Sequence, residues 1–137
     1  MRTLSPFLFF LLVAFAAQGQ NILTDTVTWN SVRAVSQSDG SEAVYNCSFT
    51  STGNQSIDWT QKGGARIYHY AVTEVDGAWP DLGIDGHISY KLSATNMTGQ
   101  MTFARAAGVI TLYLKTVYNG KQDINHVFYI SSFQRGQ

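Results

Sequence analysis

Residues 109–131, VITLYLKTVYNGKQDINHVFYIS, contain the strongest structural signal in the chain. Apolar and polar residues alternate on both sides of Asn119-Gly120. A period of two is typical of a β-strand with one buried face. Asn and Gly both tolerate the positive φ angles of a two-residue type I′ turn. This segment therefore predicts an antiparallel hairpin. The residues that share one face of its second strand are Ile124, His126, Phe128 and Ile130.

The same pattern extends toward the N-terminus. Six further alternating runs precede the hairpin, and clusters of Gly, Asn, Asp and Ser separate them at intervals of roughly ten residues, which is typical of all-β proteins. We place these runs at 27–35, 43–49, 57–59, 65–75, 87–95 and 100–106. No run shows a sustained 3.6-residue period, so no long helix is expected after the N-terminal segment.

Eight strands joined mostly by short turns predict an antiparallel meander, and eight is a strand number that closes into a small barrel. A single all-β domain with a barrel architecture is therefore expected, and a two-sheet sandwich is the alternative. In strand number, and in Trp29 on the first strand, the arrangement resembles the lipocalin and fatty-acid-binding group of small barrels. Val27 stands where that group usually has Gly, two residues before the Trp, so the resemblance concerns architecture.

The N-terminus has the three regions of a secretory signal peptide: Arg2, an apolar run over residues 7–17, and the small-x-small ending Ala17-Gln18-Gly19. The apolar run is roughly half of the ~20 residues that a membrane-spanning helix requires. We expect residues 1–19 to be a signal peptide and residues 20–137 to be the mature domain, exported to the periplasm or the extracellular space, without direct membrane insertion after cleavage.

The cysteine content of the chain bears on the organism it comes from, and its charge bears on the partners it can bind. Cys47 is the single cysteine in the 137 residues, whereas small eukaryotic extracellular domains are usually rich in disulfides, so a bacterial source is favoured. Nine basic and nine acidic residues are scattered along the chain, so no basic face is expected for nucleic acid. Three glycosylation triplets begin at Asn46, Asn54 and Asn96, and the sequence leaves open whether they are used.

No catalytic set and no metal site can be assigned from the sequence. The chain has no Gly-x-Ser-x-Gly motif, and His69, His87 and His126 lie on different expected strands without the close spacing of metal ligands. Cys47 alternates with two aromatic residues, which predicts a small buried side chain instead of a reactive thiolate. No cofactor is expected.

The candidate binding residues are aromatic. Residues 76–86 form the longest stretch without alternation and contain Trp79, which could cap a pocket mouth, stack on a sugar ring or bury itself to pin the loop. Tyr68, Tyr70 and Tyr90 lie on expected strands. Tyrosine pairs apolar area with a hydroxyl, so these side chains are suited to a ligand cavity or an interface, and simple solvent-facing strand positions are the alternative.

The expected function is that of a secreted, non-catalytic binding module for a small apolar ligand or a protein partner. The ligand version predicts a cavity of ~300 Å³ or more near one end of the barrel. The partner version predicts an exposed patch of Tyr and Trp. The alternatives are a structural subunit of a cell-envelope assembly and a small secreted hydrolase or lyase, which would need a His bonded to a carboxylate inside a cleft.

Overall fold

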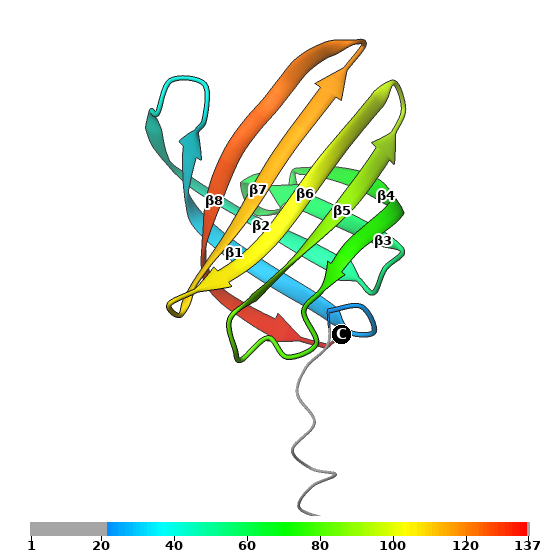
Figure 1. The fold of residues 1–137 in the computed structure, drawn as a ribbon. Helices are drawn as coiled ribbons and strands as arrows, with labels where there is room; N and C mark the ends of the chain where they lie inside the picture. The colour runs from blue at the N-terminus through cyan, green and yellow to red at the C-terminus, as the bar shows by residue number, and fades with distance from the viewer. Residues whose placement is uncertain (1–21, 137) are drawn as a thin grey trace, which may run out of the picture.

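The computed structural model describes residues 22–136, in which eight antiparallel strands close into a barrel (Figure 1). The strands are β1 (Thr26–Ser36), β2 (Glu42–Thr52), β3 (Ser56–Gln61), β4 (Arg66–Ala78), β5 (Gly86–Ala94), β6 (Met97–Ala106), β7 (Val109–Tyr118) and β8 (Lys121–Arg135). A single 3₁₀ turn, η1 (Lys62–Gly64), joins β3 to β4.

Each strand pairs with the next in the sequence, and β8 returns to pair with β1. The barrel prediction is therefore confirmed, and the sandwich alternative is wrong. Closure removes the two free edge strands that an open sheet of eight strands would have. The expected signal peptide, residues 1–19, lies outside the described residues. Within residues 22–136, no helix has the length and apolar character needed to cross a membrane.

Two aromatic clusters fill the barrel interior. The lower cluster, which includes Trp79 of the β4–β5 connection, is centred on Trp29, which contacts Phe103 edge-on at 4.9 Å and Phe133 at 5.2 Å between ring centroids. The upper cluster is centred on Trp59, which stacks on Phe49 with ring centroids 5.5 Å apart. Alternation along the strands brings these rings inward because successive side chains of a strand point to opposite faces.

A bulge in β1 overturns one detail of the alternation. Val27, Trp29 and Arg33 share one parity in the sequence, so regular alternation would put Arg33 on the same face as the other two. The pairing of β1 with both neighbours shifts between Ser31 and Arg33. The extra residue reverses the parity, so Ala34 is buried while Arg33 turns outward. The Ser31 hydroxyl, buried at the bulge, donates to the carbonyl of Tyr129 at 2.9 Å.

The long loop is shorter than its sequence predicts. Residues 76–86 were expected to lack regular structure, but β4 continues through Ala78 and β5 begins at Gly86. Asp76 and Gly77 pair with Ser89 and Ile88 of β5, and this pairing satisfies backbone groups that local composition would assign to a loop. The actual connection spans residues 79–85.

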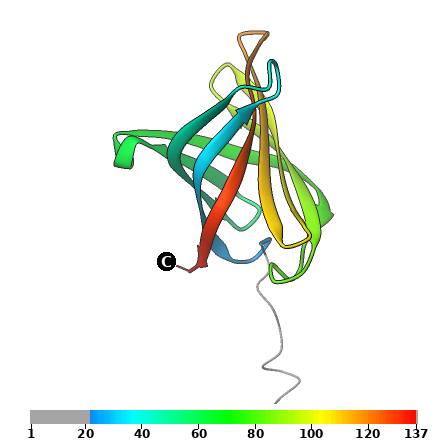
Figure 2. The same ribbon diagram turned by 90° about the vertical axis from the view of Figure 1, so that its left-hand side faces the viewer.

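The two ends of the barrel differ. At the lower end in Figure 1, the β4–β5 connection folds under the strands, and Ile22, Trp79 and Leu82 are fully or almost fully buried there. Arg105 of β6 donates from Nη1 to the carbonyl of Leu82 at 2.8 Å and ties the connection to the wall. The upper end, where the β5–β6 and β7–β8 turns lie, has no such cover in either view (Figures 1 and 2).

Candidate ligand-binding pocket

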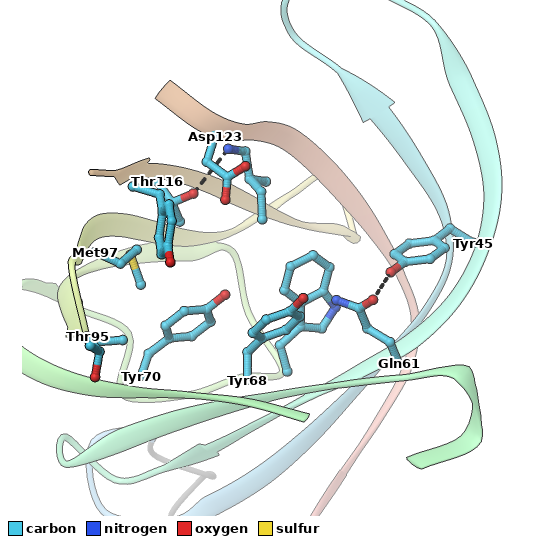
Figure 3. A pocket seen from close by; sticks show the side chains of 12 residues that line it. Tyr45, Gln61, Tyr68, Tyr70, Thr95, Met97, Thr116 and Asp123 are labelled. Atoms are coloured by element: carbon cyan, nitrogen blue, oxygen red, sulfur yellow. Dashed lines mark hydrogen bonds between the residues drawn. The ribbon is translucent and has the colours of Figure 1, made fainter. Parts of the chain in front are cut away.

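A pocket of about 590 Å³ opens at the uncovered end of the barrel (Figure 3). Side chains from β2 through β8 form its wall, so it lies inside the ring of strands and not on the outer surface. The lining residues are Tyr45, Trp59, Gln61, Tyr68, Tyr70, Ala94, Thr95, Met97, Thr116, Tyr118, Asp123 and Ile124.

The floor of the pocket is the upper aromatic cluster. Trp59 is buried and fixed by Phe49 on one face, and Phe128 meets it edge-on at 5.5 Å. The ring of Tyr68 lies 5.7 Å from that of Trp59 and extends the aromatic surface toward the mouth. Because the barrel core itself holds Trp59, the floor is rigid, which lowers the entropy lost when a ligand stacks on it.

Strand β4 supplies two tyrosines to the pocket. Parity alone left open which face of this strand is buried, and the structure turns Tyr68, Tyr70 and Val72 inward. Tyr70 is 4% exposed, while Tyr68, nearer the mouth, is 40% exposed. Burial raises the pKa of the Tyr70 hydroxyl, and the neighbouring Tyr68 and Asp123 raise it further. Tyr70 is therefore a neutral hydroxyl at physiological pH.

A polar pair stiffens one side of the wall. The Tyr45 hydroxyl of β2 donates to Oε1 of Gln61 of β3, whose side chain is buried at 5% exposure. Burial also raises the pKa of Tyr45, so this hydroxyl stays protonated and remains a donor. At the mouth, Arg66 Nη1 donates to the Tyr68 hydroxyl at 3.4 Å.

A second bulge shapes the opposite wall. Val117 pairs with Gln122 and Lys115 pairs with Asn125, so Thr116 of β7 faces two residues of β8, Asp123 and Ile124. The buried Thr116 hydroxyl accepts the backbone N–H of Ile124 at 3.1 Å. Regular alternation would send consecutive residues to opposite faces of the sheet, but at this bulge Asp123 and Ile124 both line the pocket.

Of the four residues that the sequence suggested for binding, two meet in this pocket. Tyr68 and Tyr70 are lining residues. Tyr90 is fully buried deeper in the barrel, with its ring 5.9 Å from Phe103 and no hydrogen-bond partner for its hydroxyl. Trp79 lies at the covered end, 1% exposed, where it donates from Nε1 to the carbonyl of Ile84 at 2.9 Å.

Several lining residues were not singled out from the sequence. Trp59 carried a usable signal, because it alternates with Ile57 on an expected strand. Gln61, at the end of β3, pairs with Arg66 of β4 and carried no signal in the sequence. Tyr118, at the end of β7, carried only the general signal of a strand tyrosine, and barrel closure places it across the pocket from β4. Asp123 has no sequence signal, since alternation with Ile124 predicts that it faces away from the interior.

The histidines do not meet in the pocket. His69 lies 2.5 Å from a carboxylate oxygen of Asp58, but both side chains are exposed on outward-facing positions of β3 and β4. Neither His87 nor His126 lines the pocket. Residues 22–136 contain no group of three or more His, Cys, Asp or Glu side chains that could hold a metal ion.

Comparisons of the chain with protein-family models, with curated proteins and with solved structures find no match. The fold and the pocket themselves define the class: a small, closed, eight-stranded antiparallel β-barrel with one covered end and one open end that leads to an aromatic pocket.

Proposed function

We propose that this protein is a binding module for a small, largely apolar ligand that enters the open end of the barrel. One observation carries the proposal: an aromatic pocket of about 590 Å³ lies inside the ring of strands. Sites for small molecules usually span about 300–1,000 Å³ and combine mostly apolar walls with a few polar groups. The volume of this pocket lies in that range, and its lining combines aromatic and aliphatic surface with hydroxyl, amide and carboxylate groups.

The chemistry of the wall favours a ligand with a ring. Trp59 and Tyr68 present adjacent aromatic surfaces, and Met97 on the far side offers a polarisable thioether that adapts to a ligand's shape. Aromatic contacts of this kind contribute about 0.5–1.5 kcal/mol each beyond the area they bury. The hydroxyl of Tyr70 supplies a neutral hydrogen-bonding group.

The proposal also covers the cellular compartment in which the protein binds its ligand. Arg2, the apolar run over residues 7–17 and the ending at Gly19 favour export and cleavage after Gly19, in a bacterial periplasm or outside the cell. Mass spectrometry of the protein recovered from its own host tests this part, because cleavage predicts a mature chain that begins at Gln20. An intact Met1 on exported material would contradict it.

Binding is tested with N-phenyl-1-naphthylamine, a neutral apolar fluorophore. The purified protein should give a saturable rise in fluorescence with one site per chain. In Ala94→Phe the new ring occupies the pocket, and affinity should fall by about tenfold or more, since the fluorophore loses most of its apolar contact. Tyr68→Ala, which removes a half-exposed wall residue, should also weaken binding.

The matched control is Ile67→Ala. Ile67 precedes Tyr68 on β4 but points outward, with 60% of its surface exposed, so its loss should leave fluorophore affinity unchanged. Thermal unfolding of each variant shows that the barrel is intact. Equal affinities of the parent protein and a folded Ala94→Phe variant would contradict the proposal, as would an absence of saturable binding.

A further inference from the structure

The bulge between β7 and β8 turns a carboxylate toward the pocket. Asp123 would face outward in a regular ladder, but the two-against-one pairing with Thr116 brings it to the lining beside Ile124. Bulges that re-aim a side chain are common next to functional sites. The hydrogen bond from the Ile124 N–H to the Thr116 hydroxyl replaces a ladder bond and holds the bulge in place.

Asp123 is the one formally charged side chain among the residues that line this pocket. Arg66 contacts the lining at the mouth, where it donates to the Tyr68 hydroxyl. In Figure 3, Asp123 lies across the pocket from Tyr68 and Tyr70, which lie beside each other. The pocket is therefore asymmetric, with negative charge on the β8 side and an aromatic floor beneath.

The rings near Asp123 add to its attraction for a cation. Tyr70 and Tyr118 line the pocket together with Asp123, and the electrostatic influence of Asp123 extends to the Tyr70 hydroxyl. Aromatic faces attract ammonium groups through the ring quadrupole, and more strongly where the cation is partly desolvated. A carboxylate combined with tyrosine rings is thus suited to an organic ammonium group.

Building on the proposed function, we propose that the ligand of this pocket carries a cationic nitrogen, an amine or a quaternary ammonium, held by the Asp123 carboxylate and the neighbouring tyrosine rings. The apolar body of the ligand lies over Trp59 and Tyr68. This orientation places the cation beside Asp123 and across the pocket from Tyr68, the lining residue that Arg66 contacts.

Three probes of similar shape and different charge test this inference by isothermal titration calorimetry: phenethylamine, phenethyl alcohol and 3-phenylpropionate. The amine should bind more tightly than the alcohol, and the alcohol more tightly than the carboxylate. Asp123→Asn keeps the size of the side chain and removes its charge. It should reduce the affinity for the amine by roughly three- to tenfold, the effect of one partly exposed charge pair, and leave the affinity for the alcohol unchanged.

Asp58→Asn is the matched control, because Asp58 is an acidic residue on the outward face of β3. It should alter none of the three affinities. Equal binding of the amine and the carboxylate, or an amine affinity that Asp123→Asn leaves unchanged, would overturn the inference. In that case N-phenyl-1-naphthylamine would still bind and Ala94→Phe would still block it, whereas failure of the proposed function removes the fluorophore signal itself.

Discussion

Trp79, from the β4–β5 connection, stacks on Trp29 of β1 with ring centroids 5.8 Å apart and planes inclined by 21°. Trp29 in turn donates from its indole Nε1 to the hydroxyl of Ser51 at 3.1 Å. The connection is thus packed into the lower aromatic cluster and covers that end of the barrel. This placement matches the option in which Trp79 buries itself and pins its loop.

Trp79→Ala should lower the free energy of unfolding by about 3–5 kcal/mol, the usual cost of removing a large buried aromatic side chain. Fluorophore binding at the opposite end should persist below the lowered melting temperature. Urea denaturation measures the first effect and fluorescence titration the second. Trp79→Phe, which keeps a ring, should cost clearly less. Equal stability of the parent and Trp79→Ala proteins would show that the stacked pair contributes little.

Gly86→Ala should destabilise the barrel through the same tryptophan. A Cβ at residue 86 would lie 2.6 Å from Cδ1 of Trp79, and the indole has no free space to retreat because it is fully buried. Overpacking of this kind typically costs about 1–3 kcal/mol. The cost should largely disappear in a Trp79→Ala background, so urea denaturation of the four proteins in the double-mutant cycle should give a clear coupling energy. Strictly additive effects would place the strain elsewhere.

Alternation in the sequence predicted eight strands, because a half-buried strand repeats with a period of two, and the strand number favoured a closed barrel over a sandwich. It failed where the backbone inserts an extra residue. The bulge in β1 sends Arg33 outward, where its guanidinium lies 4.1 Å above the ring of Tyr129. No residue type marks that insertion in the sequence, so its effect on Arg33 and Ala34 could not be predicted.

The pocket was predictable only in part. Tyr68 and Tyr70 stood out by residue type, but both faces of β4 contain large side chains, so parity could not say which face is buried. Asp123 reaches the pocket through a register shift that depends on how β7 and β8 pair. Tyr118 joins the lining because closure of the barrel places β7 across the pocket from β4.

Tyr90→Phe should leave the barrel as stable as the parent protein or more stable. The Tyr90 hydroxyl is buried without a hydrogen-bond partner, and an unsatisfied buried polar group costs about 1–3 kcal/mol. The matched comparison is Tyr113→Phe, because the Tyr113 hydroxyl donates to Oδ1 of Asn125 at 2.6 Å. Loss of this hydrogen bond should lower the free energy of unfolding by about 0.5–1.5 kcal/mol. Urea denaturation distinguishes the two. A loss from Tyr90→Phe as large as that from Tyr113→Phe would indicate that the Tyr90 hydroxyl is satisfied in solution.

The Cys47 thiol should react slowly in the folded protein. Burial raises the pKa of Cys47, and the nearby Trp59 indole offsets this only in part. Because the thiolate is the reactive form, reaction with Ellman's reagent near pH 8 should be roughly tenfold or more slower in the folded protein than in urea. A folded-state rate equal to that in urea would mean that the thiol is open to solvent.

Alkaline pH should destabilise the barrel through two buried tyrosines. Burial is the main cause that raises the pKa of Tyr70 and of Tyr90 well above the usual value of about 10. In the unfolded chain both hydroxyls ionise near that usual value, so above about pH 10 unfolding releases protons that the folded state retains. The stabilisation is complete below about pH 10 and is lost as the pH rises toward the raised values. Each tyrosine lowers the free energy of unfolding by up to about 1.4 kcal/mol per pH unit in that range.

Urea denaturation at about pH 9 and about pH 11 measures this loss, and the double variant Tyr70→Phe/Tyr90→Phe should show a smaller one, because phenylalanine has no proton to release. The remaining tyrosines and lysines titrate in both proteins, so an identical pH dependence in the two would mean that neither buried hydroxyl resists ionisation.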